Sequence, residues 1–520
     1  MRWQNKFLVN MSKKSPLQFK HFHSGVSVEK EMSYYRSKPA LYWEKKGQKM
    51  AIDLFRYTSK TVPAYKKFLK TNKIDPEKIK LIKDLEIVPF ITKDNYLREY
   101  SYLDLFPHKD IFSATTISAT SGSTGESFYF PRNEEHDFQY ERAAEIFLKN
   151  QFAIDKKKTL GIVGFAFGIW IGGIFTYKTF NKIAQKGHKL TLIPVGANKD
   201  LYLKSFKKFA PFYDQIILMG YPPFIKDLLD SGPSYGINWK KYNIRILTAA
   251  EGYSERFRKY IAQKAGVKNI VNDIINIYGT VEQGTIAHET PLGNLIRKIA
   301  VENKKIFKAL FLNATNIPTL AQYYPQTVYF EEINGEIIAT NYGSSIPFIR
   351  YKFSDLGGVI SFDEMVEKFS VLGIDIFKEA KKIGISDKIL RLPFVYVYSR
   401  SDFAVIFRGA NIYPEEIRNA LDSREMSKFV TGKTTIIRRE DKKLNQILEI
   451  NVELKEKIKW NRELKEKITS FVMKELCLHN SEYNYLHSVE PEKVVPTIVG
   501  WTYQHPKYFN RVGKHRWVKK

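Results

Sequence analysis

The sequence predicts an α/β protein that has a large N-terminal body of wound sheets with helices and a small α+β C-terminal domain. Three observations support this prediction. A chain of 520 residues is too long for one ordinary hydrophobic core. Apolar runs alternate with helical stretches through the middle of the chain. After residue 399 the pattern changes to short strands around one helix, at 461–476.

Continuous apolar runs predict the strands of the large body. They occupy residues 160–163, 190–195, 215–219, 245–249 and 274–278. Amphipathic helical stretches lie between these runs, for example at 254–265. This alternation is typical of a wound sheet, in which ligands bind beyond the carboxyl ends of the strands. The tips of these strands are therefore the first places to examine for a site.

The first part of the chain is predicted to be mainly helical over residues 31–105, with breaks at Pro63 and Pro76. Residues 111–117 and 128–130 read as two strands on either side of a hydroxyl-rich loop. A hairpin of this kind would hold the loop at the margin of a sheet.

Charge and cysteine content limit the classes of function. Lys and Arg number 83 against 55 Asp and Glu, a net charge of +28, but the lysines are scattered and no zinc-finger or RNA-binding-sheet signature is present. We therefore expect no nucleic-acid partner, although the positive field suits a nucleotide or CoA. The single cysteine, Cys477, excludes a disulfide framework and a cysteine-based zinc cluster, which fits a cytoplasmic location.

Two segments could indicate targeting to or insertion into a membrane, and we expect neither to do so. Residues 1–28 lack acidic side chains, but no continuous apolar core follows the basic start, so we expect a frayed terminus rather than a secretory signal. Residues 159–177 carry no charge and are long enough to span a membrane, yet they include five glycines. We interpret them as a buried strand leading into a packed helix.

The run Ser121-Gly122-Ser123-Thr124-Gly125 has the composition of a phosphate-binding loop. Glycine permits backbone angles closed to other residues, so that main-chain N–H groups can converge on an anion, and the hydroxyl groups add donors. A solvated linker is the alternative interpretation. No Gly-Lys-Ser/Thr follows, so the run does not match the phosphate loop of GxxxxGK[ST] proteins.

Three strand tips carry residues that could surround a nucleotide. They are Ala249-Ala250-Glu251-Gly252, Tyr278-Gly279-Thr280-Val281-Glu282, and the segment from Arg350 to Asp355. An aromatic ring beside a glycine offers an open face for stacking a base, and a carboxylate four residues later can hold Mg²⁺ alongside phosphate oxygens. Each tip alone is more often turn or cap chemistry, but the ordered set is harder to explain in that way.

In this order the motifs resemble those of the adenylate-forming (ANL) superfamily of acyl-CoA synthetases, within its phenylacetate-CoA ligase branch, which includes capsule-biosynthesis relatives. The resemblance covers nearly the whole chain. It rests on the residues 121–125, on the three strand tips, on Arg400-Ser401-Asp402 followed by residues 409–417, and on the N-terminal runs 62–65 and 88–93.

The resemblance implies a two-step reaction on a carboxylic acid. ATP converts the acid to an acyl-adenylate with release of pyrophosphate; a small C-terminal domain, residues 399–520, then rotates against the adenylation domain, residues 1–398, so that a thiol or amine takes the acyl group. The implied cofactors are ATP, Mg²⁺ and CoA. Charge develops on the α-phosphorus in the first step, so that cations and fixed donors should surround it.

The resemblance also implies a role for individual residues. These are Ser121, Gly122, Ser123, Thr124 and Gly125 on the β- and γ-phosphates, Ala250 and Glu251 beside adenine, Tyr278 stacked on adenine with Gly279 and Thr280 in the same motif, Glu282 on Mg²⁺, Asp355 on the ribose hydroxyls, Arg400 and Asp402 at the hinge, Gly409 lining the thiol tunnel, and Lys514 as the catalytic lysine between carboxylate and α-phosphate.

The chain departs from the family pattern at several positions. Val281 replaces a hydroxyl residue, a donor that Thr280 would have to supply. Glu126-Ser127 follows the phosphate loop where Lys or Pro is usual, and the stretch between Asp355 and Arg400 is long enough to hold an extra element. Lys507 and Lys519 are alternatives to Lys514 as the catalytic lysine.

The sequence leaves the substrate and the acceptor open. Residues 165–175, which include Phe167 and Trp170, either line a pocket for an aromatic or alkyl acid or form an ordinary buried helix. CoA is the expected acceptor, and an amine or a carrier-protein thiol is the alternative. A noncatalytic basic scaffold or nucleic-acid-binding protein is the alternative from another class. The oligomeric state is not predicted.

Overall fold

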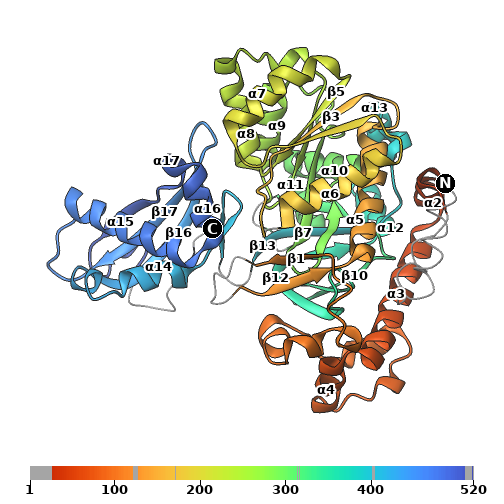
Figure 1. Cartoon of the computed structure of the whole chain (residues 1–520), viewed down its shortest axis with the longest axis horizontal. Helices are drawn as coiled ribbons and strands as arrows, with labels where there is room; N and C mark the ends of the chain where they lie inside the picture. The colour runs from red at the N-terminus through yellow and green to blue at the C-terminus, as the bar shows by residue number, and fades with distance from the viewer. Residues whose placement is uncertain are drawn as a thin grey trace. The chain divides into compact units, whose positions relative to one another are not determined.

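The computed structural model describes residues 26–120, 127–169, 171–312, 314, 317–400, 404–509 and 518, with residues 399 and 400 described by their backbone alone. The chain divides into two compact units (Figure 1). Unit 1 comprises Met1–Ser118, Tyr129–Gly220 and Leu228–Ser399. Unit 2 comprises Ala119–Phe128, Tyr221–Asp227 and Arg400–Lys520.

The N-terminal part of unit 1 is helical as far as residue 71. Its helices are α2 (Val28–Ser37), α3 (Ala40–Thr61) and α4 (Pro63–Thr71). Ser27 caps α2 by accepting a hydrogen bond from the N–H of Lys30, and Pro63 occupies the first turn of α4, where its missing N–H costs nothing. Beyond residue 75 the expected helix is replaced by short 3₁₀ turns, at Pro76–Lys78, Ile82–Ile87 and Tyr102–Leu105, and by one π-helical turn, Lys93–Leu97.

Unit 1 contains an 11-stranded mixed sheet with the strand order β10-β11-β12-β13-β9-β8-β7-β6-β5-β3-β4. One half is parallel and is made of β3 (Thr159–Val163), β4 (Leu190–Pro194), β5 (Gln215–Gly220), β6 (Ile244–Thr248) and β7 (Ile274–Thr280). Every residue of β3, β5 and β6 is buried, because helices cover both faces. Burial on both faces explains why these strands appear in the sequence as continuous apolar runs.

The other half of the sheet has antiparallel pairs. Its strands are β8 (Gly284–His288), β9 (Thr319–Gln322), β10 (Val328–Ile333), β11 (Glu336–Asn341), β12 (Phe348–Ile360) and β13 (Phe394–Arg400). The pairing of β11 with β12 shifts register twice. These irregularities fall beside Arg350 and Ser354, two residues of β12 with left-handed φ values of 50° and 69°.

Helices pack around this sheet. They are α5 (Glu134–Phe147), α6 (Ile171–Gln185), α7 (Lys199–Phe209), α8 (Pro222–Ser231), α9 (Glu255–Ala265), α10 (Pro291–Glu302), α11 (Lys304–Leu310), α12 (Phe362–Val371) and α13 (Ile376–Lys382). In Figure 1, α7 and α9 gather with β3 and β5 at one end of unit 1, and α4 lies at the other. Helices α12 and α13 form the extra element between Asp355 and Arg400, and their apolar side chains join the core cluster that α10 and α11 contribute to.

Strands β1 (Thr116–Ala119) and β2 (Tyr129–Arg132) form a two-stranded sheet of their own. The prediction of a strand over 111–117 is wrong for most of its length. The carboxylate of Asp110 accepts hydrogen bonds from the N–H groups of Phe112 and Ser113, at 2.9 and 3.3 Å, and so fixes a turn there.

Unit 2 holds an α+β module. It contains the hairpin β14 (Val405–Phe407) and β15 (Ala410–Ile412), the sheet β16 (Val430–Glu440), β17 (Gln446–Leu454) and β18 (Thr497–Trp501), and the helices α14 (Pro414–Leu421), α15 (Arg462–His479), α16 (Ser481–Val489) and α17 (Pro491–Val494). Leu464, Ile468, Val472 and Leu476 form the buried face of α15. Their spacing of three to four residues is that of an amphipathic helix.

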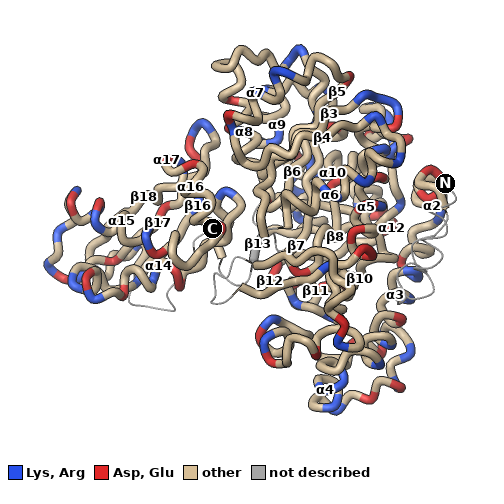
Figure 2. The backbone as a smooth tube through the Cα atoms, viewed as in Figure 1, with Lys and Arg blue, Asp and Glu red and all other residues tan. Residues whose placement is uncertain are grey.

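Two further expectations concern the surface and the membrane. Figure 2 shows Lys and Arg spread along the described parts of both units rather than gathered on one element. Among the described residues, none of the helices has the length and apolarity that crossing a bilayer requires. Residues 159–177 instead contain β3 and the first half of α6.

Candidate active site

Several predicted site residues lie outside the described part of the chain. They are Ser121 to Gly125, Asp402, Lys514 and its alternative Lys519, and for Arg400 only the backbone is described. The other predicted site residues can be placed, and all but Gly409 belong to unit 1.

Tyr278 and Asp355 meet in space although 77 residues separate them. The hydroxyl of Tyr278, near the end of β7, donates a hydrogen bond of 2.6 Å to Oδ2 of Asp355 on β12. The length is that of a charge-assisted O–H···O⁻ bond. Asp355 is buried and Tyr278 is half-buried. The ring predicted to stack on adenine is thus oriented by the carboxylate predicted to bind ribose.

The loop after β6 reaches the same region through strained backbone. Ala250 has a left-handed φ of 82°, which a residue with a Cβ rarely adopts. The carbonyl of Glu251 accepts a 3.1 Å hydrogen bond from the side-chain amide of Asn276 on β7, so that this loop is held against β7 two residues before Tyr278. Thr248, the last residue of β6, also bonds the Asn276 side chain, at 3.0 Å.

Gly279 is required by a close approach between strands. A Cβ at this position would collide with the carbonyl oxygen of Gly284, on the neighbouring strand β8. Thr280 accepts a hydrogen bond of 3.2 Å from the N–H of Gln283 through its hydroxyl oxygen. In that bond the Thr280 hydroxyl acts as an acceptor, so its proton can still be donated. Thr280 would need such a donor to replace the one that is missing at Val281.

Glu282 forms an ion pair of 2.6 Å with Lys93, and Glu282 is buried. The segment that carries Lys93 is held by main-chain bonds to β12: the N–H of Ile91 donates to the carbonyl of Arg350, and the N–H of Lys352 donates to that of Ile91, both at 3.1 Å. The N-terminal run at residues 88–93 therefore delivers a cation to the carboxylate predicted to bind Mg²⁺.

Arg350, the first residue of the motif that ends at Asp355, does not point to the site. Its guanidinium donates to the carbonyls of Leu85, Glu86 and Val88 at 2.7 to 3.1 Å, and it pairs with Glu331. Its role in this structure is to fasten the N-terminal segment to β12.

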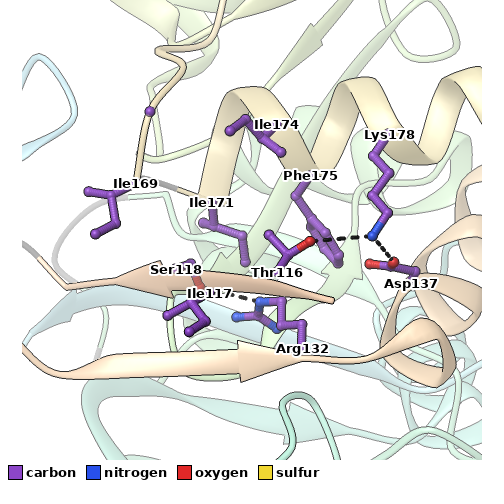
Figure 3. A pocket seen from close by; sticks show the side chains of 11 residues that line it. Thr116, Ile117, Ser118, Arg132, Asp137, Ile169, Ile171, Ile174, Phe175 and Lys178 are labelled. Carbon is purple, nitrogen blue, oxygen red and sulfur yellow. Dashed lines mark hydrogen bonds and ion pairs between the residues drawn. The ribbon is translucent and has the colours of Figure 1, made fainter. Parts of the chain in front are cut away.

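Arg132 is a buried residue beside Glu282 that the sequence analysis did not single out. It ends β2, is 1% exposed, and donates to the carbonyls of Val281 and Gly343. A third, longer bond of 3.4 Å reaches the hydroxyl of Ser118 on β1 (Figure 3). Burial lowers the pKa of Arg132 to about 10, and the nearby charges of Asp137 and Glu282 oppose that shift.

A small pocket of about 20 Å³ lies beside Arg132, between β1 and α6. Ile117, Ile169 and Ile174 form apolar walls, and Lys178 closes one side by pairing with Asp137 at 2.5 Å (Figure 3). The space accommodates about one water molecule rather than an acyl group.

The segment predicted to line an acyl pocket is described except for Trp170. Phe165 and Phe167 pack in the core cluster of β3, β5 and α6, whereas Phe175 lies 5.3 Å beneath the guanidinium of Arg132. Phe175 also stacks on Tyr140 with a centroid separation of 4.7 Å. In this structure these rings serve as core packing.

In unit 2, Gly409 has a structural reason to be glycine. Arg408 and Gly409 form the two-residue turn between β14 and β15, with φ values of 51° and 88°. Such a turn needs left-handed backbone at both positions.

The ammonium of Lys507 lies 5.2 Å from the ring of Trp501 and 5.3 Å from that of Tyr508. This aromatic contact engages the ammonium of Lys507.

Comparison with known proteins finds ligases that are similar to most of the chain. No protein-family model matches the chain. The phenylacetate-coenzyme A ligase of Thermus thermophilus is 22% identical over 378 residues, which are 71% of this chain and 72% of that protein. The phenylacetate-coenzyme A ligase of Pseudomonas putida is 21% identical over 365 residues, which are 68% of this chain and 70% of that protein.

Solved structures share the fold. A structure of 2-hydroxyisobutyryl-CoA ligase with 2-HIB-AMP and CoA in the thioesterification state has a TM-score of 0.63 at 15% identity, covering 94% of this chain and 91% of that one. An open conformation of the same ligase has a TM-score of 0.53 at 14% identity, with 94% of each chain covered. At this identity the likeness establishes the fold alone.

The chain is thus similar in sequence to named acid-CoA ligases and similar in fold to a solved CoA ligase. These relatives agree with the predicted resemblance to the phenylacetate-CoA ligase branch of the adenylate-forming superfamily. The predicted fold class and this resemblance are confirmed.

Proposed function

We propose that the protein activates a carboxylic acid with ATP to form an acyl-adenylate and then transfers the acyl group to CoA. The observation that carries this proposal is the hydrogen bond between Tyr278 and Asp355, which joins two motifs of the family at one point. Curated relatives that bear the name phenylacetate-coenzyme A ligase support the acid-thiol ligase class.

Each described residue has a task in the proposed first step. Tyr278 would present its ring to adenine, and Asp355 would accept the ribose hydroxyls. Glu282 would hold Mg²⁺, and a single carboxylate is sufficient because protein-bound Mg²⁺ usually completes its shell with substrate phosphates and water. Lys93 would leave Glu282 when the metal binds and become available to a phosphate oxygen, since its stem is flexible.

The remaining assignments concern residues outside the described part of the chain. Residues 121–125 would hold the β- and γ-phosphates, and Lys514 would lie between the carboxylate and the α-phosphate. Residues 399–520 would rotate about Arg400 and Asp402 after adenylation, and Gly409 would then line the path of the thiol. These assignments follow from the family resemblance.

The acid would be aromatic or alkyl, and CoA is the proposed acceptor. The test is a panel of carboxylic acids assayed for release of pyrophosphate and AMP, with and without CoA. A carboxylate-CoA ligase gives pyrophosphate that depends on the acid and AMP that depends on CoA. Turnover that requires an amine or a carrier protein in place of CoA would reject the acceptor, and absence of acid-dependent pyrophosphate across the panel would reject the proposal.

A further inference from the structure

We propose that Arg132 is a positioning residue for adenylation, which fixes the turn carrying Glu282 to strands β1 and β2. The inference rests on the proposed function and adds to it a residue that the motifs do not include.

Arg132 joins three segments that are far apart in the sequence. Its guanidinium donates to the carbonyl of Val281, directly before Glu282, and to that of Gly343, in the loop between β11 and β12. Its Nε reaches the hydroxyl of Ser118 on β1. Arg132 itself ends β2, so one buried side chain ties β1, β2, the turn after β7 and the loop before β12.

The segments that Arg132 joins are in close contact. A Cβ at Gly343 would collide with the carbonyl oxygen of Gln283, so the loop at 343 is packed directly on the turn that holds Glu282. The N–H of Ser345, in the same loop, donates to the carbonyl of Pro131 at 2.8 Å. Arg132 therefore lies where the turn, the loop and the strand β2 converge.

Only arginine has the geometry for these bonds. A guanidinium offers five donors in a rigid planar fork and can serve several carbonyls at once, whereas the ammonium of lysine is a single point on a flexible stem. The ring of Phe175 supports the guanidinium from one side, at 5.3 Å. The carbonyls at 281 and 343 lie in a turn and a loop, where strand pairing supplies no donor in place of Arg132.

The hydrogen bond from Arg132 to the carbonyl of Val281 places its guanidinium next to Glu282, the residue assigned to Mg²⁺ on the phosphate side of the site. None of these three hydrogen bonds reaches Ala250, Tyr278 or Asp355, which are assigned to adenine and ribose. A positioning role on the phosphate side therefore predicts a selective effect. The affinity for MgATP should fall while the affinity for AMP is retained, which a general loss of stability would not produce.

The experiment compares three variants of the full-length protein by calorimetric titration with MgATP and with AMP, together with the melting temperature. Arg132→Met should raise the Kd for MgATP by about 10–100-fold, as is typical when a residue that orients a ligand-binding group is removed, and should change the Kd for AMP by less than about twofold. Arg132→Lys should give an intermediate increase for MgATP, and it serves as the test if Arg132→Met does not fold.

Arg142→Met is the matched control. Arg142, on α5, is also a buried arginine that donates to a main-chain carbonyl, that of Val26, and it pairs with Glu31. This variant should lower the melting temperature and leave both affinities unchanged.

Parallel losses of MgATP and AMP affinity in the Arg132 variants, or unchanged affinities, would overturn the inference. The outcome is separable from that of the proposed function. Wild-type protein that binds both nucleotides but exchanges no pyrophosphate with any acid would contradict the function, while the ratio of the two dissociation constants would still decide the role of Arg132. Wild-type protein that binds neither nucleotide would contradict both.

Discussion

Replacing Tyr278 by phenylalanine removes one hydroxyl group and with it the bond of 2.6 Å to Asp355. The ring remains available for stacking, but the carboxylate no longer fixes its orientation. A hydrogen bond to a charged group contributes about 1.5–3 kcal/mol. Tyr278 is half-buried, so we take the lower end, about 1.5 kcal/mol, which corresponds to about a tenfold loss of AMP affinity.

A double-mutant cycle isolates this contact from the other roles of the two residues. AMP affinity is measured by calorimetry for the wild type, Tyr278→Phe, Asp355→Asn and the double variant. Because the two side chains touch, Tyr278→Phe should cost less in the Asp355→Asn background, with a coupling of about 0.5–3 kcal/mol. Tyr324→Phe is a control, since its hydroxyl bonds His288 at 2.9 Å rather than any site residue. Additive losses would refute the reasoning that Asp355 orients Tyr278.

Three further predictions concern backbone, catalysis and pH. Gly279→Ala should abolish nucleotide binding because its Cβ would meet the carbonyl of Gly284 on β8, and normal AMP affinity in titration would contradict this. Lys514→Ala should reduce adenylation by orders of magnitude while sparing thioester formation from preformed adenylate, and Lys507→Ala should spare both; equal losses in the two half-reactions of Lys514→Ala would show that the lysine is wrongly assigned. Burial lowers the pKa of His288 to about 4, so the unfolded state binds its proton more readily and stability falls as the pH drops below about 6.5. Between pH 7 and 5 this contributes a loss of about 2 kcal/mol, which chemical denaturation of His288→Gln should lack; an unchanged pH dependence in the variant would contradict it.

The parallel half of the sheet was predictable from the sequence, and its boundaries agree to within one or two residues at β4, β5, β6 and β7. These strands are buried on both faces and therefore appear as uninterrupted apolar runs. Strands β8, β9 and β13 were not predicted. Strand β9 has only four residues, and β8 is flanked by polar residues in the sequence. Strand β13 is an apolar run, and its place depends on antiparallel pairing with β9, which is distant in sequence.

The sequence predicted only those site residues that belong to a motif of adjacent residues. Tyr278, Glu282 and Asp355 each have recognisable neighbours in the sequence. Tyr278 lies near the end of β7 and Glu282 in the turn after it, but Asp355 lies within β12 rather than at the predicted strand tip, and its contact with Tyr278 depends on the register of β12. Lys93 and Arg132 carry no local signal of their function. Their roles come from what lies opposite them after folding, namely a carboxylate for Lys93 and two carbonyls for Arg132.

The central claim is that this polypeptide joins a carboxylic acid to AMP at the place where Tyr278 and Asp355 meet. Exchange of labelled pyrophosphate into ATP measures that step without a need for the acceptor. The account predicts exchange that requires both Mg²⁺ and a carboxylic acid, and that is strongly reduced in Asp355→Ala. Exchange that is absent with every acid, or that persists undiminished in Asp355→Ala, would contradict it.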